Sequence, residues 1–357
     1  MRVCIIGSGL SSLTLAKALV NQKIYVENFS KKKTKINDKS RTIGITKSNI
    51  EFLNNEIINI KKIIWKINKI EIFAEKLIKE KLLNFESKNE QIFSIVKNFE
   101  LEKILQKSLV KNKFYKINYQ DNLPFDLNDY DLVINLDHSN TISKKFFNKK
   151  ISKKYNSLAF TVIFKHEKIS NTVARQIFTK MGPLAFLPVS DNETSVVYSI
   201  KNSNDLKREN FVDLINHYNF FYKIKEVKKI SSFELNSINL RSYYHKNILA
   251  FGDLLHRIHP LAGQGFNMTL RDIKTLLEII KNKQDLGLPL NISVNEEFQK
   301  KIKHKNYIFS NGIDLVYEFF NFEERIKSNF FAKSLKHFGN KKFVNKIFKK
   351  IADNGFI

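Results

Sequence analysis

The sequence predicts an α/β protein in which a parallel sheet is interrupted by an inserted antiparallel sheet and followed by C-terminal helices. Residues 2–6 form an apolar, β-branched run, and a glycine turn leads from it into helical spacing over 13–20. A second apolar run follows at 23–29, and strand, helix and strand in this order predict parallel pairing. Longer β-rich runs at 158–166 and 194–200 predict the antiparallel sheet.

The same patterns predict the remaining elements. Strand-like runs within residues 65–96 are assigned to a different sheet. The sequence returns to helical spacing over residues 98–109, and the apolar run at 131–136 predicts a buried strand. Residues 182–190 are expected to form a loop, and 247–253 a strand that ends in Gly-Asp. One face of the following helix is formed by Ile273, Leu276, Leu277 and Ile280.

These elements predict a nucleotide-binding domain that is discontinuous in sequence, because the insertion separates its strands. The tail is helical in period and rich in Phe and Lys. We expect the first domain to comprise residues 1–64, 97–150 and 240–290, the substrate domain to comprise 65–96 and 151–239, and a C-terminal helical region to comprise 291–357.

Composition narrows the class of protein. The chain has 357 residues, of which 43% are hydrophobic, enough to bury a substantial core. Its one cysteine, Cys4, lies in an apolar run and predicts neither a disulfide nor a metal site nor a nucleophile. We expect a cytoplasmic protein, since no run of eighteen apolar residues and no export signal is seen.

The formal net charge of +26 raises the question of a polyanionic partner. Nearly all of the excess is Lys, scattered along the chain beside abundant Asn, Ile and Phe, which indicates a general composition bias. Nucleic acid is not expected as a partner, because no Arg-rich stripe or nucleic-acid motif is present. Residues 341–352 set Phe and Ile on one helical face and Lys on the other, which predicts a helix packed onto the body of the protein, with an anionic membrane surface as the alternative.

The first candidate site is the segment "GSGLSS", which lies between a strand and a helix. Gly7 and Gly9 let the backbone approach a pyrophosphate at a positive helix end, and Ser12 stands where a third glycine is usual. Glu27 follows Gly7 by 20 residues, where a carboxylate can accept hydrogen bonds from a ribose diol. This pattern predicts a Rossmann-like dinucleotide-binding domain, with a chance glycine turn as the alternative.

The second candidate site is "FGDLLHRIHPLAGQGFNMTLRD", residues 251–272. A strand ends in Gly-Asp, and a glycine turn then opens a helix whose first amides suit an anion or a negatively charged ring. An ordinary strand-loop-helix connection is the alternative. His256 and His259 are three residues apart but have no acidic or cysteine partner at zinc spacing, so no metal is expected.

The chain resembles the FAD-dependent aromatic hydroxylases, the class A flavoprotein monooxygenases of the para-hydroxybenzoate hydroxylase fold, and within them the ubiquinone-biosynthesis hydroxylases. The family pattern "GDAAH…HPxxGQGxNxGxxD" matches residues 252–272, and "AxQxF…GPLAxLP" matches residues 174–188. Arg41 in "RTIGIT" matches an arginine that approaches the cofactor. The resemblance implies a Rossmann-like FAD-binding domain with an inserted antiparallel β-sheet substrate domain and C-terminal helices.

The resemblance also implies residue roles. Asp253 would bind the ribityl chain or a nearby phosphate, Pro260 would lie beside the isoalloxazine ring, and residues 263–267 would offer backbone N–H groups to its N1/C2 carbonyl edge. No catalytic side chain is assigned. The expected cofactor-binding residues are Gly7, Gly9, Ser12, Glu27, Arg41, Asp137, Gly252, Asp253, Pro260, Gly263, Gln264, Gly265, Phe266 and Asn267.

The chain also departs from the family pattern, most of all where small residues are replaced by larger ones. The family's "DGxxSxxR" is "DHSNTISK" here, with Asp137, Thr141 and Lys144 at matching positions. These departures leave open a degenerate, non-catalytic member. The larger residues are His138 and Thr269 in place of glycines, and Leu254 and Leu255 in place of alanines.

The function that the resemblance implies is hydroxylation of the ring of a polyprenylated phenol in ubiquinone biosynthesis. In that family NADH or NADPH reduces FAD, and O2 adds to give a C4a-hydroperoxyflavin. A non-catalytic flavin-binding or scaffold subunit of the biosynthetic complex and an isoprenoid reductase on the same fold are the alternatives. Other proteins of the pathway and the inner face of the cytoplasmic membrane are expected as further partners.

Overall fold

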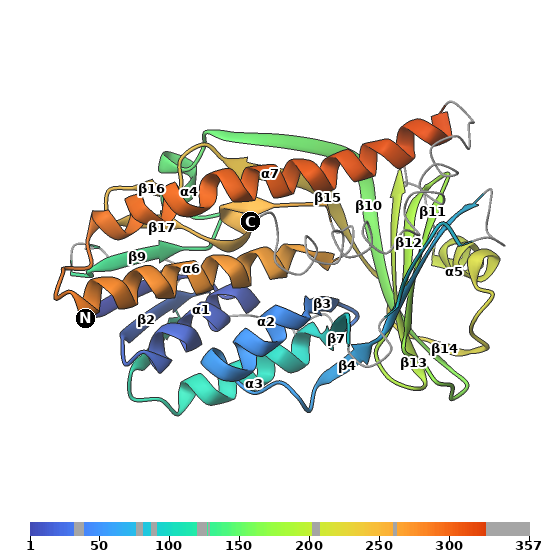
Figure 1. The fold of residues 1–357 in the computed structure, drawn as a ribbon, viewed down its shortest axis with the longest axis horizontal. Helices are drawn as coiled ribbons and strands as arrows, with labels where there is room; N and C mark the ends of the chain where they lie inside the picture. Colours follow the sequence, from blue (N-terminus) through green and yellow to red (C-terminus); the bar gives the residue numbers. More distant parts are fainter. Residues whose placement is uncertain are drawn as a thin grey trace.

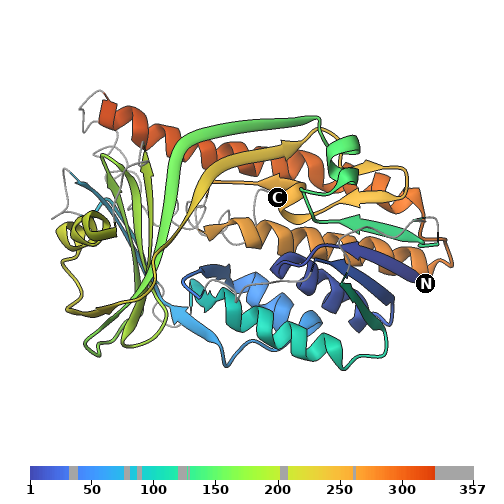
Figure 2. The ribbon, with the colours of Figure 1, turned by 180° about the vertical axis from the view of Figure 1, so that it is seen from behind.

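Two sheets at opposite ends of the molecule are joined by long strands and helices (Figure 1). Strands β10 (Lys150–His166) and β15 (Ser231–Leu240) run from one end to the other (Figure 2). The predicted α/β class, with parallel and antiparallel sheets and C-terminal helices, is confirmed. This computed structural model describes residues 1–31, 39–75, 81–86, 91–119, 127, 129–201, 208–259 and 263–325.

The first sheet has six strands in the order β16-β17-β9-β1-β2-β8 and is parallel except at the β16 edge. Its central strand is buried, with residues 3–6 at most 2% exposed. Helix α1 packs against α3 and α6. The elements are β1 (Arg2–Ile6), α1 (Leu10–Asn21), β2 (Tyr25–Ser30), α3 (Asn98–Val110), β8 (Tyr115–Tyr119), β9 (Leu132–Asn135), α4 (Thr141–Phe146), β16 (Tyr244–His245) and β17 (Ile248–Ala250).

A small antiparallel sheet of three strands, in the order β3-β7-β4, lies between the two large ones. The runs within 65–96 therefore divide, since β4 and β7 join β3 whereas β5 and β6 extend the second large sheet. The bounds are β3 (Thr42–Thr46), α2 (Lys47–Phe52), the π-helix η1 (Leu53–Ile57), β4 (Ile64–Ile67), β5 (Lys69–Ala74), β6 (Leu83–Glu86) and β7 (Phe93–Lys97).

The second large sheet has the strand order β18-β15-β10-β13-β12-β11-β5-β6, with β14 paired to β10. Its pairs are antiparallel except for β5 with β11. Alternate residues of β10, β12 and β13 form a hydrophobic cluster with residues 211–222 of α5 and the segment after it. The remaining bounds are β11 (Val173–Thr179), β12 (Gly182–Pro188), β13 (Glu193–Lys201), α5 (Arg208–Tyr218), β14 (Ile224–Val227) and β18 (His256–Arg257).

The expectation of a loop at 182–190 is wrong for its first seven residues, which form strand β12. Its two prolines, Pro183 and Pro188, lie next to or at the strand's ends, where a missing N–H disturbs the ladder least. Gly182 has a φ of +138°, and a Cβ on it would lie 2.1 Å from the carbonyl oxygen of Ser199. No other residue fits this position, so the glycine fixes where the strand starts.

The two C-terminal helices are α6 (Gly265–Asp285) and α7 (Ile292–Arg325), which lie against each other. The predicted apolar face of α6 is buried, because its four named residues are at most 7% exposed. Within the described residues, no helix is long and apolar enough to cross a membrane. Residues 341–352 lie outside the described residues, so their predicted amphipathic helix stays a prediction.

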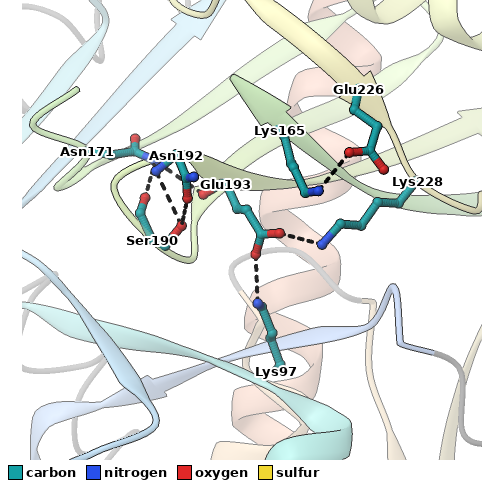
Figure 3. Close-up of polar contacts among 8 residues, drawn as sticks. All are labelled: Lys97, Lys165, Asn171, Ser190, Asn192, Glu193, Glu226 and Lys228. Carbon is teal, nitrogen blue, oxygen red and sulfur yellow. Dashed lines mark hydrogen bonds and ion pairs between the residues drawn. The ribbon is translucent and has the colours of Figure 1, made fainter. Parts of the chain in front are cut away.

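Glu193 joins the small sheet to the second large one (Figure 3). Its carboxylate accepts hydrogen bonds from Lys228 and from Lys97, whose Nζ lies 2.7 Å away at the end of β7. Burial alone would raise the pKa of Glu193, but these two ammonium groups outweigh it and hold the pKa below its usual range. Beside this pair, the Thr42 hydroxyl donates to Ser195 across the same junction at 2.8 Å.

Candidate dinucleotide site

The carboxyl ends of three neighbouring strands, β9, β1 and β17, meet at one edge of the parallel sheet. Gly7 follows β1 and Gly252 follows β17, with φ values of +151° and +60°. A Cβ on Gly7 would lie 3.1 Å from the Cβ of Leu136, and one on Gly252 would lie 3.3 Å from its Cδ2. Both glycines therefore make a close approach to Leu136 in backbone conformations that favour glycine, which brings the two sequence motifs together.

The N-terminus of α1 opens at this edge. Gly9 is its N-cap, and a Cβ added there would meet no atom within 4 Å, so the space before the helix is open. The first amides of a helix have no partner within it and attract anions. Ser12 is fully buried, and its hydroxyl donates to the carbonyl of Gly9 at 2.7 Å. Its side chain therefore does not occupy the space before α1.

Asp137 and Asp253 both lie near these glycines. Asp137 follows β9, and its Oδ1 accepts hydrogen bonds from the amide and hydroxyl of Ser139 at 2.8 and 2.7 Å. Asp253 is exposed on the 3-10 helix η3 (Gly252–Leu254), directly after the close approach of Gly252. His138, which replaces a family glycine, is exposed to solvent.

The other bulky replacements are packed into the protein rather than into the space before α1. Leu254 and Leu255 are 5% and 0% exposed and belong to the main hydrophobic core. Thr269 is 2% exposed within α6. Their side chains therefore fill the interior, and the space before α1 stays open despite them.

Glu27 does not lie at the strand ends. It pairs with Cys4 in the middle of β1, and its carboxylate is 5% exposed. Both carboxylate oxygens are engaged: Asn118 and Lys116 donate to Oε1 at 2.9 and 3.0 Å, and Tyr130 and Arg2 donate to Oε2 at 2.6 and 2.9 Å. The structure thus separates Glu27 from the glycines with which the sequence grouped it.

The surroundings of Glu27 determine its charge. Burial alone would raise its pKa, but the hydrogen bonds from Tyr130, Asn118, Lys116 and Arg2 outweigh burial and lower the pKa from 4.5 to about 2. Tyr130 responds in the opposite direction, since burial and its bond to Glu27 raise its pKa. Glu27 is a buried, charged residue whose hydrogen bonds connect β2 to β8 and to the segment before β9.

The second glycine turn is held by the side chain of Asn267, which is 1% exposed. Its Nδ2 donates to the carbonyl of Gly44 at 2.9 Å, and its Oδ1 accepts from the amide of Thr46 at 3.1 Å and from Asn49 at 2.9 Å. Gly263 has a φ of +62°, and a Cβ on it would lie 3.5 Å from the backbone nitrogen of Gly44. Asn267 therefore fixes β3 against the start of α6.

The N-terminus of α6 has the features of a site for a polar ring. Gln264 is 6% exposed, and its Oε1 has no hydrogen-bond partner among the residues that the structure describes. A Cβ on Gly265 would meet no atom within 4 Å, and Phe266 is half-buried beside it. An orphaned acceptor next to open space fits a ligand that carries an N–H group, as flavin does. Pro260 lies outside the described residues.

Arg41 lies between the two large sheets. It is exposed, and its guanidinium lies 4.9 Å from the ring centre of Phe233 on β15. Nearby, the hydroxyls of Ser40 and Thr161 are 3.0 Å apart. This contact shows that Thr161 of β10 faces the segment that leads into β3 of the small sheet. Its register partner Val197, and Ala185 beyond it, share that face.

An aromatic cluster that the sequence did not reveal lies beside the second glycine turn. The ring of His259 stacks on Tyr317 of α7 at 4.2 Å and meets the edge of Tyr155 on β10 at 4.8 Å. Tyr155 also donates to Asp314. Burial, followed by the charges of Lys153 and Lys201, lowers the pKa of His259 to about 3, so it is neutral. These residues are far apart in sequence, and no local spacing could group them.

No protein-family model matches the chain. The chain is 31% identical over 155 residues to the 3-demethoxyubiquinol 3-hydroxylase of Escherichia coli, covering 41% of this chain and 39% of that protein. It is 30% identical over 165 residues to the human ubiquinone biosynthesis monooxygenase COQ6, covering 34% and 35%. These matches span about two fifths of the relatives' length. The resemblance stated from the sequence is confirmed.

Solved structures agree over nearly the whole chain. The p-nitrophenol 4-monooxygenase PnpA of Pseudomonas putida superposes with a TM-score of 0.79 at 11% identity, covering 99% of this chain and 98% of that one. Klebsiella pneumoniae HpxO, complexed with FAD and uric acid, gives 0.76 at 12% identity, covering 99% and 97%. At such identities the likeness establishes the fold, which is that of the FAD-dependent monooxygenases.

The first prediction concerns Glu27. Because its folded pKa lies near 2 and its unfolded value near 4.5, its charge stabilises the fold above about pH 5, and this contribution is lost as the pH falls towards 2. Glu27→Gln should therefore lower the free energy of unfolding at pH 7 by roughly 3 kcal/mol, and by progressively less at lower pH. Urea unfolding at several pH values measures this.

The matched control for that measurement is Glu278→Gln, since Glu278 is an exposed carboxylate on α6. It should change stability by about 0.5 kcal/mol or less at every pH. A Glu27→Gln protein as stable as the wild type at pH 7 would contradict the role given to the four donors.

Proposed function

We propose that the protein is an FAD-dependent, NAD(P)H-using monooxygenase that hydroxylates the ring of a polyprenylated phenol in ubiquinone biosynthesis. The observation that carries this proposal is that two helices, α1 and α6, both begin next to open space. Helix α1 begins beside Gly7 and Gly252, and α6 begins beside the side-chain oxygen of Gln264, which has no hydrogen-bond partner among the described residues. The names of the curated relatives support the substrate class.

The residues of the two sites have separate tasks toward FAD. The amides at the start of α1 would bind its pyrophosphate, and Asp253 would accept hydrogen bonds from the hydroxyls of the ribityl chain. Gln264 and the amides at the start of α6 would bind the polar edge of the ring, and the α6 dipole favours negative charge there. Bound flavin supplies electron transfer from NAD(P)H and the activation of O2.

The inner face of the antiparallel sheet supplies a surface for the substrate. Gln176, Ala185 and Val197 lie side by side across β11, β12 and β13, and all three are half-buried. The alternate residues Ile177, Leu184 and Tyr198 are completely buried on the other face. The uncharged side chains of these three residues suit an apolar tail of the substrate.

Two alternatives predict different measurements. An isoprenoid reductase on this fold would bind flavin but form no hydroxylated product. A scaffold subunit would either bind no flavin or bind it without catalysing its reduction and reoxidation. The visible spectrum of the purified protein and the consumption of O2 with substrate separate the three functions.

The second prediction tests the cofactor. The full chain should bind FAD non-covalently, and Asp253→Ala should lower FAD affinity roughly tenfold or more, because charge-assisted hydrogen bonds are lost. Asp285→Ala, which removes an exposed carboxylate at the far end of α6, is the control and should leave affinity unchanged. Equal FAD affinity in all three proteins, measured by flavin fluorescence, would remove Asp253 from the site.

The third prediction tests the substrate. A phenol with one prenyl unit should bind more than tenfold more tightly than the bare phenol, since each buried CH2 contributes about 0.8 kcal/mol at best. With NAD(P)H and ¹⁸O2, mass spectrometry should find one labelled oxygen in the product. Release of peroxide alone with every prenylated phenol, or label derived from water, would overturn the proposed reaction.

We further infer a peripheral position on an anionic membrane, where a polyprenylated substrate resides, with other proteins of the same pathway as neighbours. Supporting this, α7 exposes Tyr307, Ile308 and Leu315 on a helix that also carries exposed lysines at 300, 301, 303 and 305. The fourth prediction is that sedimentation with anionic vesicles falls with added salt and with Leu315→Glu. Equal binding to neutral and anionic vesicles would contradict it.

A further inference from the structure

Tyr317 on α7 has a buried hydroxyl group with no hydrogen-bond partner among the residues that the structure describes. The residue is 3% exposed, so bulk solvent does not supply the partner. The hydroxyl of the neighbouring Tyr155 differs, because it donates to Asp314. An unpaired buried hydroxyl costs free energy, and this cost favours a bound group that completes the hydrogen bond.

Tyr317 packs against the inner face of the antiparallel sheet. It shares a hydrophobic cluster with Ala159 of β10. Ala159 lies two residues before Thr161 in an uninterrupted register, so both side chains are on the same face of the sheet. That face continues through Val197 and Ala185, two of the side chains that the proposed function gives to the substrate. Tyr317 therefore borders the substrate surface.

The ring of Tyr317 also contacts the segment that leads to the second glycine turn. It stacks on the ring of His259, with centres 4.2 Å apart and an interplanar angle of 30°. His259 precedes Gln264 by five residues, and Gln264 carries the oxygen assigned above to the polar edge of flavin. Tyr317 thus lies between the substrate surface and the segment expected to hold the isoalloxazine, where a substrate ring has to lie to be hydroxylated.

The surroundings of Tyr317 favour an oxygen atom as the partner of its hydroxyl. The ammonium of Lys201 lies 5.7 Å from the centre of the Tyr317 ring. It repels a cationic ligand, whereas an oxygen that accepts a hydrogen bond carries partial negative charge. On a prenylated phenol only the ring carries oxygen, since the tail is hydrocarbon. The part of such a substrate that can pair with Tyr317 is therefore its ring oxygen.

We propose that Tyr317 is a specificity-determining residue whose hydroxyl donates a hydrogen bond to an oxygen substituent on the ring of the substrate. The inference rests on the proposed function and names the residue that recognises the polar end of the substrate, while the inner face of the sheet receives the tail. An analogue without that oxygen leaves the buried hydroxyl unpaired, so the site selects against it.

The first measurement compares two ligands that differ only in this oxygen. A phenol with one prenyl unit and the corresponding prenylbenzene are titrated by calorimetry into the FAD-bound chain, without NAD(P)H, so that no reaction occurs. The wild type should bind the phenol roughly tenfold more tightly than the prenylbenzene. In Tyr317→Phe this preference should disappear, while the affinities for prenylbenzene and for FAD are not reduced.

The second measurement does not depend on flavin. Because the chain gives the hydroxyl no partner, Tyr317→Phe should leave the equilibrium constant for unfolding in urea unchanged or lower it. The matched control is Tyr198→Phe, which removes a fully buried hydroxyl that lies 2.8 Å from the hydroxyl of Thr179, on the opposite face of the sheet. The control should raise that constant roughly fivefold and keep the preference for the phenol.

The outcomes separate this inference from the proposed function. An unchanged preference in Tyr317→Phe, or a loss of stability equal to that of Tyr198→Phe, overturns the role of Tyr317 alone. A loss of FAD affinity in Tyr317→Phe assigns the hydroxyl to flavin and also overturns it. If the chain binds no FAD, the flavin function fails, and titration of the flavin-free chain decides. A preference lost only in Tyr317→Phe then supports the inference, and absence of phenol binding overturns both.

Discussion

The hydrogen bonds of the Asn267 side chain join strand β3 of the small sheet to the start of α6. One amide group binds the backbone of β3 through Gly44 and Thr46, and it sits in the first turn of α6. β3 pairs with β7, which carries Lys97 to Glu193 on the antiparallel sheet. The placement of the carboxyl edge of the parallel sheet relative to the inner face of the antiparallel sheet therefore depends in part on a chain of contacts that starts at this buried amide.

The parts of the site that the sequence predicted are those determined by local backbone geometry. Gly7 and Gly252 occupy conformations that favour glycine, and each directly follows a short apolar strand, so spacing alone located both. The start of α6 was predictable for the same reason, because a glycine turn precedes a regular apolar face. What the spacing could not show is that both glycines pack on one residue, Leu136, which directly follows a third strand, β9.

The parts that the sequence did not predict depend on register and on distant partners. Glu27 is 20 residues after Gly7, a suitable interval, yet β2 continues to Ser30 and places the carboxylate inside the sheet. The sequence predicts a loop at 182–190, whereas pairing with β11 and β13 makes residues 182–188 a strand. The cluster of His259, Tyr155 and Tyr317 joins three elements that share no local pattern.

The register of strand β2 also distinguishes one lysine, Lys31, from the many others that the amino-acid composition supplies. The chain has 61 lysines and arginines against 35 acidic residues, so one more lysine after a strand carries no information by itself. Lys31 differs from the scattered lysines because β2 ends level with Gly7 and because its ammonium contacts Ser139 across β1. A biased composition therefore does not prevent the specific placement of one cation, since the fold determines which lysine reaches across the carboxyl end of β1.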